Sequence, residues 1–93
     1  MPTYLVEVYV PRSRSEEARA AGLRTRDAAR ALSQEGVPVR YVSTTLLPDD
    51  ETCFHLIEAP TSADAEEVCR RAALWRARIV PAIEATRPES QSQ

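Results

Sequence analysis

Apolar and polar residues alternate over the first ten positions of the chain. One side of an extended segment there would carry Tyr4, Val6, Val8 and Val10, and the other side Leu5, Glu7 and Tyr9. A period of two with β-branched and aromatic residues predicts a β-strand from Thr3 to Val10. Pro11 ends this strand, because proline has no N–H to donate to a neighbouring strand.

The spacing then changes to that of an α-helix. Small and apolar residues recur every three or four positions, namely Ala18, Ala21, Thr25, Ala28, Ala29 and Leu32. Ser13 and Glu16 match a capping box at the first turn, and Gly36 is expected just after the last turn. Gly22 costs about 1 kcal/mol relative to alanine inside a helix, so we expect another element to approach closely there.

A β-hairpin is predicted between Val37 and Pro60. Its first strand runs to about Leu47, a polar turn follows over residues 48–51, and its second strand runs to Glu58. Side chains two positions apart share a face of a strand. One face is therefore expected to carry Tyr41, Ser43 and Thr45 on the first strand, with Cys53, His55 and Ile57 on the second.

A second helix and a last strand complete the pattern. Thr61 or Ser62 is expected to cap the helix, whose apolar stripe is Ala65, Val68, Cys69 and Ala72. Residues 78–83 predict a short strand, and Pro81 favours an edge position for it. Residues 86–93 are polar and without pattern, so we expect a disordered tail.

The order β-α-β-β-α-β predicts an α+β, ferredoxin-like domain over residues 1–85, with a four-stranded antiparallel sheet and both helices on one face. Right-handed crossovers place the first and third strands in the centre. The helix-free face is expected to present Glu7, Tyr9, Tyr41, Ser43, Thr45, Cys53, His55 and Ile57. Such a face either meets a second subunit or forms the floor of a ligand pocket.

Composition narrows the classes of partner and of chemistry. The chain has 93 residues and a formal net charge of −2, which gives no reason to expect nucleic-acid or membrane binding. All 12 basic residues are arginine, which excludes lysine Schiff bases and suggests a GC-rich bacterial genome. The chain carries no recognisable signal peptide, and two cysteines make no disulfide framework, so we expect a cytoplasmic protein with free thiols. So short a chain has a thin stability margin, which favours a homodimer.

Three stretches resemble one small bacterial family: YLVEVYVP, PVRYVSTTLLPDDETCFHLIEAP and RRAALWRARIV. This is the ferredoxin-like family generally labelled nickel-binding protein, formerly a domain of unknown function. The resemblance spans residues 3–83, and its most specific parts are Glu7, the acidic turn before Thr52-Cys53-Phe54, and Glu58-Ala59-Pro60. It implies binding of nickel or another transition metal. Many relatives carry a histidine at the position of Val68, so a nickel site that uses this helix histidine cannot form here.

The candidate metal ligands are Cys53, His55 and Glu7. Cys53 and His55, two positions apart on one strand, would lie about 6.5–7 Å apart on one face. Thiolate and imidazole together suit nickel, copper or zinc, and Glu7 on the neighbouring strand would add an oxygen ligand. The alternative is a half-buried cysteine and histidine in a sheet face or a dimer contact. Glu7 is expected to pair with Arg40, Arg78 or His55.

Two tyrosines and a tryptophan are the remaining candidates. Tyr9 and Tyr41 are expected to line a pocket for a small apolar or aromatic ligand, or else to lie in a dimer interface. Trp75 is expected to anchor the packing of the last strand or of the dimer.

Three functions remain open from the sequence. The first is a cytoplasmic homodimeric protein that binds a metal or a small ligand on the helix-free face. The second is a dimeric α+β barrel enzyme that acts on an aromatic or polyketide-like molecule, with His55 as the acid or base and Glu7 orienting it. The third is a structural or regulatory dimer without a ligand.

Overall fold

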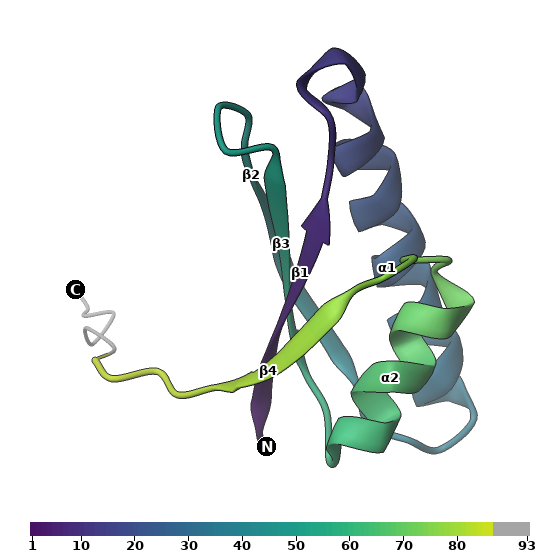
Figure 1. Cartoon of the computed structure of the whole chain (residues 1–93). Helices are drawn as coiled ribbons and strands as arrows, with labels where there is room; N and C mark the ends of the chain where they lie inside the picture. Colours follow the sequence, from purple (N-terminus) through teal and green to yellow (C-terminus); the bar gives the residue numbers. More distant parts are fainter. Residues whose placement is uncertain (87–93) are drawn as a thin grey trace, which may run out of the picture.

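The chain folds into a four-stranded sheet covered by two helices, as seen in a computed structural model that describes residues 1–86 (Figure 1). Its elements are β1 (Thr3–Tyr9), a 3₁₀ turn η1 (Arg12–Arg14), α1 (Glu16–Gln34), β2 (Arg40–Leu47), β3 (Thr52–Glu58), α2 (Ser62–Arg71) and β4 (Arg78–Ala82). The predicted order and the α+β, ferredoxin-like fold are confirmed. The predicted tail falls, except for Thr86, outside the described residues.

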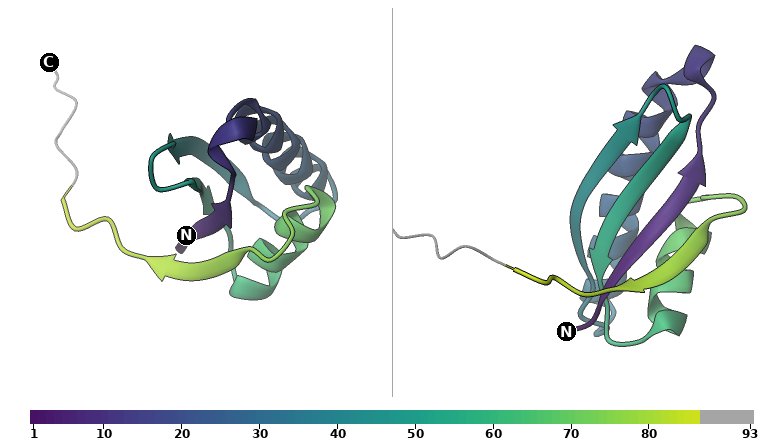
Figure 2. Two further views of the ribbon diagram at one scale, coloured as in Figure 1. Left: turned by 45° about the horizontal axis from the view of Figure 1, so that its top comes forward. Right: turned by 60° about the vertical axis from the view of Figure 1, so that its left-hand side comes forward.

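The sheet is antiparallel throughout, and its strand order is β2-β3-β1-β4. β1 and β3 therefore lie in the centre and β4 at an edge, as predicted. Figure 2 shows both helices on one side of the sheet, so its other face carries no helix. We call this uncovered side the open face.

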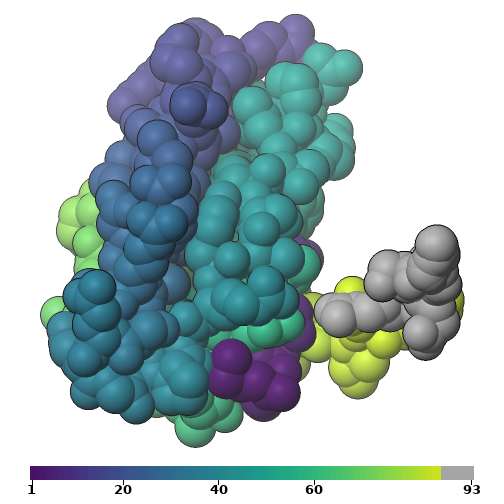
Figure 3. All heavy atoms as spheres, turned by 180° about the vertical axis from the view of Figure 1, so that it is seen from behind, coloured from purple at the N-terminus to yellow at the C-terminus, as the bar shows by residue number. Residues whose placement is uncertain are grey.

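The core lies between the sheet and the helices. The sheet contributes Val6 and Ile57, and α2 contributes Ala65 and Val68, all four with no exposed surface. The small residues of α1 let that helix lie directly against β2, and the space-filling view of Figure 3 shows the two side by side. The alanine-rich stripe therefore packs against the sheet through close approach of the helix backbone rather than through large side chains.

The helix ends agree with the prediction except at the start of α1. Ser13 and Glu16 do not form a capping box, because residues 12–14 form the turn η1 and the helix begins at Glu16 after Ser15. The C-terminal end is as predicted. Gly36 has a φ of 103°, its N–H donates to Ser33 O, and Val37 N–H donates to Leu32 O, which is a Schellman motif. Thr61 caps α2 by accepting a bond from Asp64 N–H.

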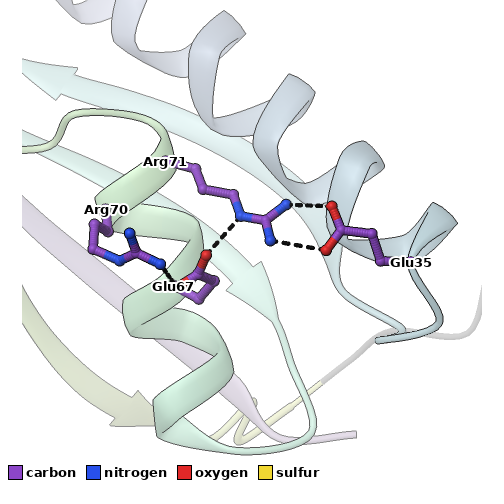
Figure 4. A network of polar contacts seen from close by, with 4 residues as sticks. All are labelled: Glu35, Glu67, Arg70 and Arg71. Carbon is purple, nitrogen blue, oxygen red and sulfur yellow. Dashed lines mark hydrogen bonds and ion pairs between the residues drawn. The ribbon is translucent and has the colours of Figure 1, made fainter.

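An arginine of α2 joins the C-terminal ends of the two helices (Figure 4). Arg71 donates two hydrogen bonds to the Glu35 carboxylate, at 2.7 and 2.8 Å, and one to Glu67 at 2.7 Å. Arg70 also contacts Glu67. The bonds from Arg71 hold the pKa values of Glu35 and Glu67 below their usual range. Both carboxylates are thus kept ionised, and α2 is held against α1.

The two faces of β3 are reversed relative to the prediction. His55 lies opposite Val6, a core residue of β1, whereas Phe54 lies opposite Glu7 and Leu56 opposite Leu5. Residues opposite each other in a ladder share a face. Cys53, His55 and Ile57 therefore face the helices, and Phe54 and Leu56 lie on the open face. The alternation alone could not decide this, because both faces of β3 carry apolar side chains.

Tyr41 is also on the other side from the one predicted. The β2–β3 register shifts between Tyr41 and Ser43, which marks a bulge in β2. Ser43 and Thr45 lie opposite Leu56 and Phe54 on the open face, as predicted. Tyr41, beyond the bulge, packs against the helix-side core.

Candidate functional site

The only histidine of the chain lies buried between the sheet and α1, in a row of four polar side chains. His55 has no exposed surface. Its Nδ1 lies 2.8 Å from Thr44 Oγ1, which in turn lies 2.5 Å from the Tyr41 hydroxyl. Its Nε2 lies 3.7 Å from Cys53 Sγ. We call Tyr41, Thr44, His55 and Cys53 the polar row.

Two proton arrangements satisfy the polar row. In one, Tyr41 donates to Thr44, Thr44 donates to Nδ1, and the Nε2–H of His55 donates to the Cys53 sulfur. In the other, every bond is reversed, from the thiol to Nε2, from Nδ1–H to Thr44 and from Thr44 to Tyr41. Since each hydroxyl and each ring nitrogen takes either role, the neutral imidazole is satisfied in both tautomers.

The bulge in β2 and the glycine in α1 together make room for this row. The bulge brings both Tyr41 and Thr44 to the helix side, although they are three positions apart. A Cβ on Gly22 would lie 2.6 Å from Thr44 Oγ1 and 3.2 Å from the Tyr41 hydroxyl. The close approach expected at Gly22 is thus confirmed, and the element that approaches is β2.

Burial keeps the side chains of His55 and Cys53 uncharged. Together with the nearby positive charge of Arg24, it lowers the pKa of His55 to about 4. Burial also raises the pKa of the Cys53 thiol. At neutral pH the row therefore consists of an uncharged imidazole and an uncharged thiol.

His55 also lies at the wall of a cavity of about 160 Å³. This His55 cavity is bounded by the end of β1, by α1, and by the turn between α2 and β4. Its lining includes Val8, Ala21 and Leu74, together with Arg14, Arg24 and Trp75. It therefore combines an apolar wall with two guanidinium groups and an aromatic side chain.

The two arginines of the cavity differ in their partners. Arg24 donates from Nε to Ala72 O at 2.9 Å and from Nη2 to Glu17 at 3.0 Å, so the Nη1 group has no protein acceptor within residues 1–86. The guanidinium of Arg14 forms no ion pair with any described residue. Glu17 is the only carboxylate that residues 1–86 contribute to the lining, so these residues give the cavity a net positive charge.

A wider hollow of about 410 Å³ lies on the other side of α1, against β2. Tyr41, Thr44 and Gly22 line it, whereas His55 and Ala21 line the His55 cavity. The polar row thus passes beneath α1 and connects the two hollows.

The structure separates Glu7 from the other two predicted metal ligands. Glu7 lies on the open face, where its Oε1 is 3.2 Å from Arg78 Nη1. Of the expected partners Arg40, Arg78 and His55, it is therefore Arg78 that pairs with Glu7. Cys53 and His55 lie on the opposite face, and the expected three-ligand group is not assembled. No three His, Cys, Asp or Glu side chains in the described part of the chain lie together as a metal site. Metal binding itself stays a prediction.

The structure also changes the roles expected of the aromatic residues. Tyr9, with 67% of its surface exposed, lines the His55 cavity, whereas Tyr41 lines the hollow beyond α1, so the two do not share a pocket. Trp75 is 78% exposed and does not anchor β4 in this chain. Glu7 cannot orient His55 from the other face of the sheet. Thr44 does so, and no sequence pattern marked this residue.

Comparison of the chain with protein-family models, with curated proteins and with solved structures finds no match. The resemblance to the nickel-binding protein family is therefore untested by these comparisons. Among residues 1–86, no helix has the length and apolar character needed to cross a bilayer.

Proposed function

We propose that this protein is a small cytoplasmic homodimer that binds a small ligand. In this dimer the open face of one subunit packs against the open face of the other. The observation that carries the proposal is an apolar strip across the middle of the open face. Leu5 of β1 lies opposite Leu56 of β3 on one side and Val80 of β4 on the other. Phe54 extends the strip along β3. A contiguous apolar patch of this kind is typical of an interaction site.

Charged pairs border the strip on both sides along the strands. On one side Arg78 pairs with Glu7 at 3.2 Å, and on the other Arg40 pairs with Glu58 at 2.9 Å. An apolar centre with a polar rim is the usual composition of a protein–protein interface. The charged pairs would then select the relative orientation of the two subunits more than they would stabilise the dimer.

The end of the chain that follows β4 supports a second copy as the occupant. Residues 83–86, which follow β4 and which we call the arm, reach away from the sheet (Figure 2), and Ile83 is 92% exposed. A hollow of about 190 Å³ on the open face is lined by Val42, Leu56 and Ile83. In a two-fold dimer each chain offers the same apolar arm and the same hollow, so the surfaces can complement each other.

The cytoplasmic part of the proposal rests on the cysteines. Cys53 and Cys69 are both free and buried. Free thiols persist where the environment is reducing.

The alternative of an enzyme with His55 as acid or base has weaker support. A pKa of about 4 makes the imidazole a poor base near neutral pH, and Glu7 does not lie beside it. An acid–base catalyst works best with a pKa near the working pH.

The dimer is tested by the mass of the protein in solution. We expect sedimentation equilibrium to give twice the chain mass of 10.4 kDa for the wild type. Phe54→Asp places a charge in the strip, so we expect it to raise the dimer dissociation constant about 100-fold or more. Leu23→Asp is the matched control, because it adds the same negative charge at an exposed leucine on α1, away from the strip.

Circular dichroism of each variant shows whether the fold is kept. A wild-type protein that remains monomeric at about 100 μM, where weak protein pairs already form, would overturn the proposal. A folded Phe54→Asp variant that dimerises as well as the wild type would overturn it equally.

A further inference from the structure

We propose that the His55 cavity is a binding site for a small aromatic carboxylate. The cavity lies on the helix side of the sheet and is built from one chain, so this inference does not depend on the dimer. Four features of the described residues carry it: the size of the cavity, its charge, its exposed tryptophan and the backbone of the turn that holds this tryptophan.

The size of the cavity fits a ligand with one ring. Sites for drug-sized ligands measure about 300–1,000 Å³, whereas this cavity measures about 160 Å³. Val8, Val10 and Leu74 supply apolar wall for the body of such a ligand. A flat ring would lie between the end of β1 and the turn after α2, which form two of the walls.

The charge of the cavity favours an anion. Arg14 has no ion-pair partner among residues 1–86, and Nη1 of Arg24 has no acceptor there. Guanidinium groups bind carboxylates through paired hydrogen bonds. Glu17 compensates only one of the two positive charges, and His55 at the wall adds none at neutral pH. A carboxylate would therefore complete the charge balance of the site.

Trp75 is placed as a binding residue rather than a packing residue. It is the only tryptophan of the chain, it lines the cavity, and 78% of its surface is exposed. Exposing so large an apolar side chain has no benefit for the stability of the isolated chain. A ring stacked on the indole would cover it, and aromatic pairs of this kind are favourable.

The turn that carries Trp75 has a strained backbone. Ala73 and Arg76 have φ values of 57° and 58°, in the left-handed region that residues other than glycine rarely adopt. Arg24 holds the beginning of this turn through its bond to Ala72 O. Strain of this kind concentrates at functional sites, where it fixes a side chain in the position that binding requires. Here it holds Trp75 beside the cavity.

The probe is benzoate, added to tag-free, ¹⁵N-labelled protein and followed by NMR. Trp75 and His55 are the only residues of their types, so the indole N–H and the imidazole nitrogens report on the two sides of the cavity separately. We expect both sets of signals to shift together and to saturate. A shift of Trp75 alone would mean that benzoate only covers the exposed indole, and it would overturn the proposal.

Chemically matched probes test the class of ligand. Benzamide has the same ring without the charge, and acetate has the charge without the ring. We expect each to bind at least tenfold more weakly than benzoate. Equal binding of benzamide would show a site for neutral aromatic molecules, and equal binding of acetate would show a simple anion site. Either result would overturn the proposed class.

Arg14→Gln tests the charge of the site within the protein. Arg14 is exposed and outside the core, so the fold should persist. We expect benzoate to bind about tenfold more weakly, the usual effect of losing one charge-assisted hydrogen bond. Arg30→Gln is the control, since Arg30 is exposed on α1 away from this cavity and should leave the affinity unchanged. Equal loss in both variants would overturn the role of Arg14.

The same titration in Phe54→Asp separates this proposal from the dimer. We expect benzoate to bind the monomeric variant as it binds the wild type, because Phe54 lies on the opposite face of the sheet. Loss of binding in a folded Phe54→Asp monomer would show that the site needs the second subunit and would contradict a site complete within one chain.

Discussion

At the scale of the residue, the position of His55 decides how its chemistry is understood. The sequence placed His55 two positions from Cys53 and predicted correctly that the two side chains share a face. The structure then puts that face under α1, where burial keeps the imidazole uncharged. A side chain expected on the open face, within reach of a metal or a substrate, is instead part of an internal row of hydrogen bonds.

We expect this burial to make the stability of the protein depend on pH. The folded-state pKa of His55, about 4, lies below the unfolded value of about 6.5, so the unfolded chain binds the proton more readily. The contribution of neutral His55 is fully present above about pH 6.5 and is lost as the pH falls toward 4. Between pH 7 and pH 5 the free energy of unfolding should fall by about 2 kcal/mol.

Urea unfolding at several pH values measures this loss. Most carboxylates titrate below about pH 4.5, so the interval from pH 7 to pH 5 reports mainly on the histidine. His55→Gln should show a flat profile over that interval, whatever its absolute stability. An NMR titration in which folded His55 ionises near pH 6.5 would contradict the prediction.

At the scale of the element, the sequence pattern predicted the helices and strands but not which face of each strand meets the helices. Both helices, the hairpin and the edge strand have marked signals, such as the Gly36 motif at the end of α1 and the Thr61 cap of α2. The facing of β3 had no such signal, because Phe54 and Leu56 are as apolar as Cys53 and Ile57. The physical choice between them depends on pairing with β1, which is a contact distant in sequence.

The bulge of β2 was equally hidden in the sequence. A strict period of two placed Tyr41 with Ser43 and Thr45, and one extra residue reversed the position of Tyr41. Bulges arise from the pairing of two strands rather than from the residues of one. The polar row could therefore not be predicted from the sequence, since only the bulge brings Tyr41 to the side of the sheet that carries Thr44.

We expect Gly22→Ala to destabilise the protein even though alanine is the better helix former. Alanine gains about 1 kcal/mol in helix propensity over glycine. The added Cβ would lie 2.6 Å from Thr44 Oγ1, so either the Thr44 side chain must give up its bonds to Tyr41 and His55 or α1 and β2 must move apart. Overpacking of this kind costs about 1–3 kcal/mol. The net result should be a lower free energy of unfolding, measured with urea.

Thr44→Ala provides the matched test of this contact. It removes the oxygen that the new Cβ would meet, so Gly22→Ala should cost less in the Thr44→Ala background than in the wild type. The difference between the two costs measures the clash. If Gly22→Ala stabilises the wild type, then α1 does not lie against β2 as closely as described.

At the scale of the whole molecule, the sheet separates two proposed interactions. The open face carries the apolar strip with Leu5 at its centre, and the side covered by helices carries the cavity with His55 at its wall. Neither surface uses residues of the other, since neighbouring residues of a strand point to opposite faces. Partner and ligand can therefore be tested independently, and coupling between them would have to pass through the sheet itself.

The arm that follows β4 gives the sharpest test of how the two chains would meet. Ile83 is 92% exposed, so Ile83→Ser removes almost no contact within one chain. If this side chain enters the hollow of the partner's open face, its loss should raise the dimer dissociation constant about tenfold, as for an apolar side chain removed from a packed interface. Sedimentation equilibrium measures the change.

Two comparisons make the result specific to the dimer. In the Phe54→Asp background, Ile83→Ser should leave the unfolding temperature of the monomer unchanged, because the arm would have no partner to contact. Leu23→Ser, at an exposed leucine of α1, should leave the dissociation constant unchanged. If Ile83→Ser dimerises as the wild type does, the two strips can still pack together, but the arms do not cross between the chains.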